Sequence, residues 1–161
     1  MSVNVGGAAA LRAHQELIAY WRQVRGSARL ARRRDIDPAG IKRLLPNILL
    51  IDVLERPRDY RMRLAGTAFY EVFGGEITGR RLADVHTPEG AAYWRDELDA
   101  VVGSRRPRVG WYALDWRNRA RAQILWLRLP LAANGADVNM ILGYDAVVGL
   151  AGQDAGGGRA A

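Results

Sequence analysis

The stretch Tyr60-Arg-Met-Arg-Leu-Ala-Gly-Thr67-Ala-Phe-Tyr-Glu-Val-Phe-Gly-Gly75 decides the fold, because it predicts a strand that leads directly into a short aromatic helix. In its first half, Tyr60, Met62 and Leu64 alternate with two arginines, which is the period of a strand that packs one face on a core. We therefore expect these three side chains to face inward and the arginines to face the other way.

The second half of this stretch predicts a helix. Gly66 permits a sharp turn, Thr67 can cap the helix, and Gly74 can end it. Three aromatic side chains belong to this helix: Phe69, Tyr70 and Phe73. One face of a sheet is therefore expected to lie under a small aromatic helix.

Two longer helices are predicted outside this stretch. Apolar residues at helical spacing predict a helix over 8–25, and its inner stripe would consist of Leu11, Leu17, Ile18, Trp21 and Val24. Thr87 followed by Pro88 is a cap signal for a second helix, which we expect to end at Gly103. Asp37-Pro38 is the same kind of signal for a shorter helix between the first helix and the sheet.

Strand and boundary signals complete the organisation. Besides the strand at Tyr60, strands are predicted at about 48–54, 109–116, 123–131 and 138–147. Trp116 to Ala120 is a candidate hairpin connection, and Asn134-Gly135 is a strong turn signal. We expect one domain over 8–148, a flexible leader at 1–7 and a disordered, glycine- and alanine-rich tail at 149–161. This order of helices and antiparallel hairpins favours an α+β fold.

Several short motifs in a fixed order resemble those of a known family. Around the central stretch they are Tyr20-Trp21-Arg22, Asp37-Pro38, the apolar run 44–53 and the segment 78–85. Together they resemble a PAS domain, and more narrowly the bacterial single-domain PAS family. The resemblance implies a five-stranded antiparallel sheet of order 2-1-5-4-3, with helices on one face and an extra N-terminal helix. It also implies a role in signal transduction.

Composition limits the chemistry. The 161 residues suffice for one buried core, and the chain has no cysteine, which excludes disulfides, thiolate metal sites and cysteine nucleophiles. No secretory leader or membrane-spanning run is evident, so we expect a cytoplasmic protein without a transmembrane segment. The formal net charge of +7 comes almost wholly from arginine and favours acidic partners.

The densest basic cluster consists of Arg29, Arg32, Arg33 and Arg34. It is either a solvated surface or a contact for an acidic protein or membrane surface. The cluster leads into Asp35 and Asp37, whose charges would face phosphates of the same sign, and it lacks an element that could read bases. We therefore expect no specific nucleic-acid binding.

The resemblance implies that the fold can hold a ligand between the inner face of the sheet and the helices of residues 67–103. Candidate ligand-binding residues are Met62, Arg63, Phe69, Tyr70, Phe73, Trp94, Tyr112 and Trp126, with Tyr93 and Trp111 as further aromatics. The alternative is that the aromatics are ordinary core. Arg63 could hold a carboxylate or phosphate of a ligand, but strand parity points it away from the core, where it would pair with a carboxylate.

Cofactor and enzyme signals are weak. His86 precedes the long helix, and beside a threonine–proline cap we expect it to be exposed or capping rather than a haem ligand. Flavin-binding light sensors need a reactive cysteine in their motif, and this chain has no cysteine. His14 and His86 are too far apart in sequence for a zinc motif. No nucleophile elbow, phosphate loop or dinucleotide fingerprint occurs.

Three functional hypotheses remain. The first is a stand-alone PAS sensor that binds a small molecule or a signalling partner protein. The second is a ligand-free dimerisation or interaction scaffold, in which Leu11, Ile18 and Trp21 of the first helix contribute to a homodimer. The third is a small enzyme of the cone-shaped isomerase or dehydratase type, which needs a buried acid or histidine that no spacing promises. A cavity of roughly 300 Å³ or more with a few polar groups would favour the sensor.

Overall fold

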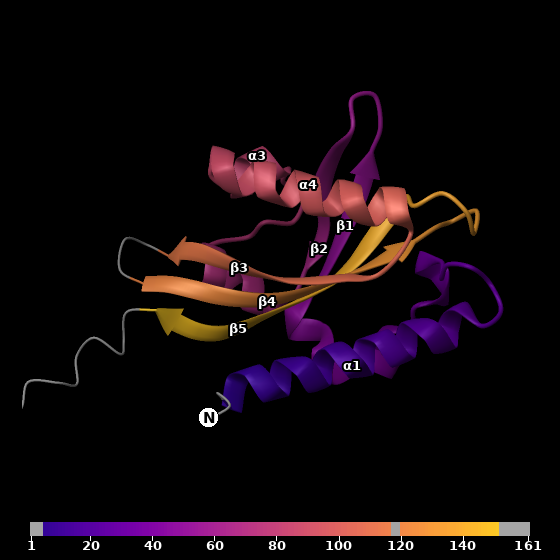
Figure 1. Cartoon of the computed structure of the whole chain (residues 1–161), viewed down its shortest axis with the longest axis horizontal. Helices are drawn as coiled ribbons and strands as arrows, with labels where there is room; N and C mark the ends of the chain where they lie inside the picture. The colour runs from indigo at the N-terminus through magenta and orange to yellow at the C-terminus, as the bar shows by residue number, and fades with distance from the viewer. Residues whose placement is uncertain (1–4, 117–119, 152–161) are drawn as a thin grey trace, which may run out of the picture.

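The structure is a computed structural model that describes residues 5–116 and 120–151 (Figure 1). Its helical elements are α1 (Val5–Arg25), η1 (Arg33–Asp35), η2 (Pro38–Asn47), α2 (Thr67–Phe73), α3 (Leu82–Val85) and α4 (Pro88–Ser104). Its strands are β1 (Ile48–Leu54), β2 (Asp59–Ala65), β3 (Arg108–Trp116), β4 (Ala120–Leu131) and β5 (Met140–Ala151).

The five strands form one antiparallel sheet of order β2-β1-β5-β4-β3, which confirms the predicted topology. The last strand in the chain therefore lies at the centre, between β1 and β4. α4 lies on one side of the sheet and α1 on the other (Figure 1). We call the side under α4 the inner face and the side under α1 the outer face.

α1 packs on β4 and β5 through a narrow stripe of side chains. Leu17 and Trp21 are fully buried, and the Trp21 indole Nε1 donates a hydrogen bond to the Pro130 carbonyl at 3.0 Å. Leu11 was expected on this stripe, but its side chain is 53% exposed. That expectation was wrong because Ala10 and Ala13 occupy the contact and turn Leu11 toward solvent.

Helix ends follow the cap signals in part. The Asp37 side chain accepts from the Ala39 amide, and the Thr87 hydroxyl accepts from the Gly90 amide, as expected of caps. Thr67, however, is not the cap of α2: Gly66 holds that position without a side-chain hydrogen bond. α4 also runs past Gly103 to Ser104, and Arg105, which caps its C-terminal end, takes the left-handed conformation.

α2 ends where expected. Gly74 has a φ of 71°, a conformation that costs an L side chain energy, and its amide donates to the Tyr70 carbonyl. This stop keeps α2 short, so the chain can cross back over the inner face toward α3.

β2 departs from simple alternation. Tyr60 and Met62 are buried as predicted, but Leu64 is 44% exposed. Met62 pairs with Ile51 and Leu64 with Leu50, so β2 carries one extra residue, a β-bulge at Arg63. The bulge moves Leu64 to the outer face, and the expectation that Leu64 faces the core was wrong.

The connections of β4 are described only in part. The turn at Asn134-Gly135 is present, and the Asn134 side chain accepts from the amides of Ala136 and Asp137. β3 and β4 pair antiparallel as far as Trp116 and Ala120, which confirms the expected hairpin, and its connecting residues 117–119 lie outside the described part of the chain. α1 begins at Val5, three residues earlier than predicted, and β5 extends to Ala151.

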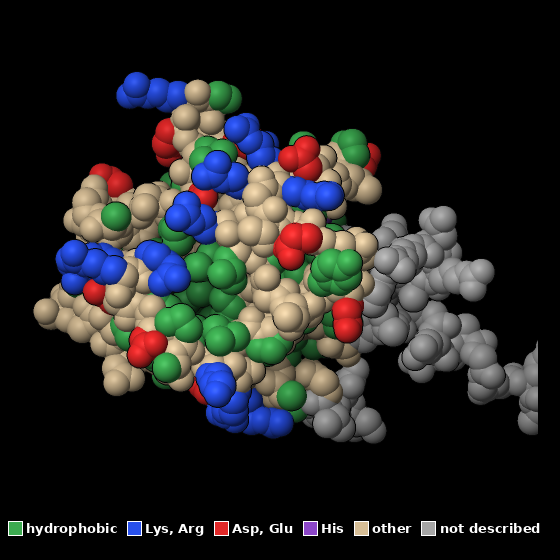
Figure 2. Space-filling view, turned by 180° about the vertical axis from the view of Figure 1, so that it is seen from behind, with side chains coloured by type: hydrophobic (Ala, Val, Ile, Leu, Met, Phe, Trp, Pro, Cys, Tyr) green, Lys and Arg blue, Asp and Glu red, His purple; other side chains and the backbone are tan. Residues whose placement is uncertain are grey.

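On one face of the molecule the positive charges are spread out rather than gathered (Figure 2). On the face seen in Figure 2, Lys and Arg side chains occur at several separate places around a central group of hydrophobic side chains, which surrounds a hollow. Among the described residues, no helix is long and apolar enough to cross a membrane.

Candidate functional site

A small cavity lies between the inner face of the sheet and the helices α2, α3 and α4. Its volume is about 20 Å³, which is room for about one water-sized group. We call it the deep cavity, and it is lined by Leu49, Ile51, Met62, Phe69, Phe73, Ile77, Leu82, Val85, His86, Trp94, Leu98, Tyr112, Ile124, Arg128 and Asp145. The lining is apolar except at one end, where the polar side chains meet.

An ion pair forms the polar end of the deep cavity. Arg128 on β4 is 1% exposed, and its two terminal nitrogens bind the two carboxylate oxygens of Asp145 on β5. The Arg128 side chain also lies over the Trp94 ring, with its central carbon 4.5 Å from the ring centroid. Asp145 thus neutralises a buried guanidinium that the Trp94 ring also contacts.

The sheet register explains this placement. Arg128 pairs with Gly143 across β4 and β5, and Asp145 pairs with Trp126, so both charged side chains lie on the inner face. A Cβ at position 143 would lie 2.9 Å from the Arg128 Nη1 atom. Gly143 therefore leaves the room in which Arg128 folds over the sheet.

Three of the residues that line the deep cavity carry a buried nitrogen without a hydrogen-bond partner within the described part of the chain. These nitrogens are the Trp94 Nε1, the Arg128 Nε and the His86 Nδ1. Their residues come from α4, β4 and the end of α3, and all three line the deep cavity. Buried polar atoms in folded proteins are normally hydrogen-bonded. The Trp94 and Arg128 nitrogens can only donate, whereas the Nδ1 of a neutral His86 donates in one tautomer and accepts in the other.

His86 is one of these groups, and its position corrects the sequence-based expectation. It was expected to be exposed or capping, but its ring packs against Phe73 at 5.5 Å and Trp94 at 6.2 Å between ring centroids. Burial lowers its pKa to about 4, with Asp145 raising and Arg128 lowering it to smaller extents. The imidazole is therefore neutral at pH 7.

Aromatic side chains close the cavity toward β3. The rings of Tyr93 and Tyr112 stack at 4.9 Å, and the Trp94 ring lies 5.3 Å from that of Trp126. The Trp126 Nε1 donates to the Tyr93 hydroxyl, which donates to the Trp111 carbonyl, each at 3.0 Å. α4 is thereby tied to β3 and β4 on the far side of the cavity.

The sequence-predicted ligand candidates divide into three groups. Met62, Phe69, Phe73, Trp94 and Tyr112 line the deep cavity. Trp126 is buried beside Trp94 without lining it. Tyr70 is 59% exposed and Arg63 points to the outer face, where its Nη1 lies 3.7 Å from Asp52. Neither reaches the cavity, and the alternative interpretation of Arg63 as the partner of a carboxylate is the one that the structure supports.

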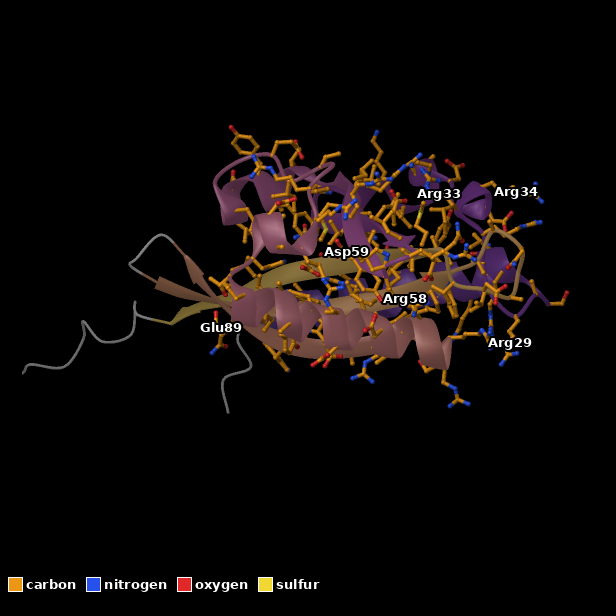
Figure 3. The ribbon with its side chains drawn as sticks, turned by 90° about the horizontal axis from the view of Figure 1, so that it is seen from above. Arg29, Arg33, Arg34, Arg58, Asp59 and Glu89 are labelled. Atoms are coloured by element: carbon orange, nitrogen blue, oxygen red, sulfur yellow. The ribbon has the colours of Figure 1, made fainter. Side chains whose placement is uncertain are left out.

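The basic cluster lies at a different place. Arg33, Arg34 and Arg29 lie at one end of the molecule, and Glu89 at the start of α4 lies at the other (Figure 3). Arg32 differs from these arginines because its guanidinium binds Asp35 at 2.9 Å. The cluster is therefore remote from the N-terminal end of α4, and part of its charge is compensated locally.

Sequence reasoning missed the polar end of the cavity. Arg128 interrupts an apolar run in β4, and it shares the parity of Ile124 and Trp126, which face inward. That parity was a readable signal. Asp145 lies in the last predicted strand, but only the register of β4 against β5 brings it to Arg128. A buried acid and a histidine therefore do meet in the cavity, although no sequence spacing promised this.

Metal chemistry has no matching arrangement here. Across residues 5–116 and 120–151, no three His, Asp or Glu side chains gather as metal ligands. Both oxygens of Asp145 accept hydrogen bonds from Arg128.

Known proteins share both the sequence pattern and the fold of this chain. The sequence profile of the family described as "PAS domain" matches residues 10–145. The PAS domain of BvgS from Bordetella pertussis superposes with a TM-score of 0.52 at 20% identity, covering 71% of this chain and 88% of that one. A Light-Oxygen-Voltage domain studied with a flavin analogue superposes with a TM-score of 0.53 at 15% identity, covering 74% of this chain and 89% of that one.

A third structure, the dark state of the blue-light photoreceptor Aureochrome1 LOV domain, superposes with a TM-score of 0.51 at 14% identity, covering 71% of this chain and 82% of that one. No curated protein matches the sequence. The strand order and the helical layer over one face are those of these PAS and Light-Oxygen-Voltage domains, so the chain has their α+β fold. The chain belongs to the PAS domain family.

Proposed function

We propose that this PAS domain is a cytoplasmic sensor that binds a small molecule in the deep cavity and acts on a signalling partner protein. The observation that carries the proposal is the group of three buried nitrogens without partners, on Trp94, Arg128 and His86. Each unsatisfied buried polar group costs on the order of 1–3 kcal/mol. A bound molecule that hydrogen-bonds to them recovers that energy, and this gain is available only to an occupant of this site.

Volume limits the occupant. The deep cavity holds about 20 Å³ in its closed form, whereas sites for drug-sized ligands enclose roughly 300 Å³ or more. The small volume of the cavity favours the hypothesis of a ligand-free scaffold. The three unpaired nitrogens favour a bound molecule. We give the polar atoms more weight, because side chains can turn aside for a ligand whereas buried donors cannot lose their need for acceptors.

We further propose that the site takes neither haem nor flavin. A closed volume of about 20 Å³ is far from that of either group. The ring of His86 packs against Phe73 and Trp94, so a porphyrin would have to displace these side chains to bring its iron to an imidazole nitrogen.

The test is native mass spectrometry of protein purified without denaturation, combined with thermal melts in the presence of small-molecule pools. We expect a retained or added molecule that raises the melting temperature. Val85→Phe, which fills the deep cavity, should abolish the effect, while the matched substitution Val109→Phe at an exposed position of β3 should not. Stabilisation by no molecule, or equal stabilisation of the Val85→Phe variant, would contradict the proposal.

A second candidate function is a homodimerisation scaffold. Val109 and Trp111 on β3 are 59% and 58% exposed, and their strand parity places them on the outer face, beyond the β4 and β5 strands that α1 contacts. Large exposed apolar side chains on one strand favour a protein contact. If this contact forms a dimer, Trp111→Ser should yield monomers in light scattering at the same protein concentration, and an unchanged mass would contradict it.

A further inference from the structure

Resting on the proposed function, we infer that the ligand is an uncharged molecule with a hydrogen-bond acceptor at one end of an apolar body, and that the site rejects the corresponding carboxylate. The inference concerns the chemistry of the occupant, which depends on what each buried group at the polar end can still do.

The acceptor follows from the donor inventory. An indole Nε1 and a guanidinium Nε each carry a hydrogen and can only donate. In Trp94 and Arg128 these two atoms are buried and without partners among the described residues, and the two side chains are 4% and 1% exposed. The ligand atom that contacts them must therefore accept, as a carbonyl, amide or ether oxygen does.

The absence of ligand charge follows from Asp145. A free buried guanidinium would recruit an anion, but Arg128 already has its counter-charge in Asp145, through both carboxylate oxygens. A second carboxylate in the same apolar surroundings would leave one net negative charge without compensation. Burying such a charge is far more costly than burying a neutral acceptor.

The apolar body follows from a second cavity beside the first. This side cavity, also of about 20 Å³, is lined by Asn47, Ala68, Phe69, Val72, Phe73, Ile124, Asp145 and Val147. Four of these residues, Phe69, Phe73, Ile124 and Asp145, line both cavities. At its far side Val147 is 41% exposed, so the side cavity reaches toward the surface between α2 and β5.

The two cavities can join through a change at their shared wall, which Phe69, Phe73, Ile124 and Asp145 form. Phe73 is partly exposed and lies in the last turn of α2, next to the left-handed Gly74. A rotation of its side chain would merge the two spaces into one elongated site. The acceptor then lies against Trp94 and Arg128, and the apolar body extends toward Val147.

The experiment uses benzamide and benzoate, which share ring and size but differ in charge at pH 7.5. Both are titrated into the ¹⁵N-labelled full chain, and binding is followed at the Trp94 indole N–H, with the exposed Trp111 indole as internal reference. We expect benzamide to shift the Trp94 signal and to bind at least tenfold more tightly than benzoate. The Trp111 signal should not move.

Asp145→Asn tests the cause of the preference. Removing the counter-charge frees Arg128 to accept an anion, so we expect the benzamide-to-benzoate ratio to fall at least tenfold or to reverse. The matched control is Asp52→Asn, which removes a carboxylate paired with Arg61 on the outer face and should leave the ratio unchanged. Thermal melts confirm folding of both variants, and the wild-type ratio alone decides if Asp145→Asn does not fold.

The outcomes separate the two proposals. Equal or tighter binding of benzoate to the wild-type chain, or a ratio unaffected by Asp145→Asn, overturns the inference on ligand chemistry and leaves the sensor proposal standing. If neither compound, up to millimolar concentration, moves the signals of residues that line the deep cavity, the inference on ligand chemistry also fails, whereas the sensor proposal fails only if no retained or added molecule stabilises the protein in its own test.

Discussion

Arg128 and Asp145 form a two-pronged ion pair across neighbouring strands at the centre of the sheet, under the ring of Trp94. The pair is buried on the side of Arg128 and almost buried on the side of Asp145, whose side chain is 11% exposed. Removing one partner leaves a buried charge unpaired and strongly lowers the stability of the folded protein. Replacing both partners by apolar residues can leave that stability nearly unchanged. The stability prediction that follows and the proposed preference for an uncharged ligand both rest on this pair.

The first prediction is that Asp145→Ala lowers the free energy of unfolding by about 3–5 kcal/mol, because it leaves the Arg128 charge buried and unpaired. The double variant Arg128→Met/Asp145→Leu should lose much less of the free energy of unfolding, because no unpaired charge is left buried. Urea denaturation of the wild type and of both variants measures this. A double variant no more stable than Asp145→Ala would show that the pair is needed for more than mutual compensation.

The second prediction concerns pH. The pKa of His86 is lowered from 6.5 to about 4 in the folded chain, so the unfolded chain takes up the proton first as the pH falls. The neutral, buried His86 therefore favours the folded chain fully above pH 6.5. Between about pH 6.5 and 4 the free energy of unfolding falls by up to about 1.4 kcal/mol per pH unit. Burial also lowers the pKa of His14, which acts in the same direction.

Urea denaturation between pH 7.5 and 5 checks this prediction by difference. His86→Asn should show a flatter decline of stability than the wild type, because the substituted residue does not titrate. The carboxylates that titrate in this range are common to both proteins and cancel. Parallel curves for the two proteins would contradict the assignment of the effect to His86.

The third prediction tests the docking of α1. Trp21→Ala should lower the free energy of unfolding by about 3–5 kcal/mol, because it removes a buried indole and its hydrogen bond to Pro130. Leu11→Ala on the same helix is the matched control and should change it by less than about 0.5 kcal/mol, since Leu11 is 53% exposed. If deleting residues 1–25 left melts and light scattering unchanged, the helix would have no structural role.

The fourth prediction is that purified protein contains no stoichiometric haem or flavin. The small closed cavity and the packed ring of His86 are the physical reasons. The check is a visible absorption spectrum of protein expressed with haem and riboflavin supplied. A Soret band or flavin bands at molar equivalence would contradict it.

The fifth prediction concerns Arg29, Arg33 and Arg34. Any nucleic-acid binding at this cluster should be indifferent to sequence and should weaken on the order of a hundredfold between 50 and 200 mM salt if several phosphates are contacted. An acidic protein or membrane surface is the expected partner. Mobility-shift titrations with specific and scrambled DNA at both salt concentrations measure this, and a sequence-selective complex at 200 mM salt would overturn it.

The sequence predicted the elements well where local chemistry decides them. Asp37 and Thr87 cap helices as their residue types require, and the alternation of Tyr60 with Met62 gave the inward face of β2. The predictions failed where the pairing between strands decides which way a side chain faces. Leu64 faces outward because a β-bulge shifts the register of β2 against β1, and the residues around Leu64 in the sequence do not predict that bulge.

By itself, the sequence determined the α+β class, the strand order through its family motifs, and the five cavity-lining residues Met62, Phe69, Phe73, Trp94 and Tyr112. These follow from periodicity and short motifs, which are properties of neighbouring residues. Only the tertiary structure decided that Arg128, Asp145 and His86 meet at one end of the cavity. Their meeting depends on the register between β4 and β5 and on the packing of α3 and α4 over the sheet, and such contacts between distant segments have no local signature in the chain.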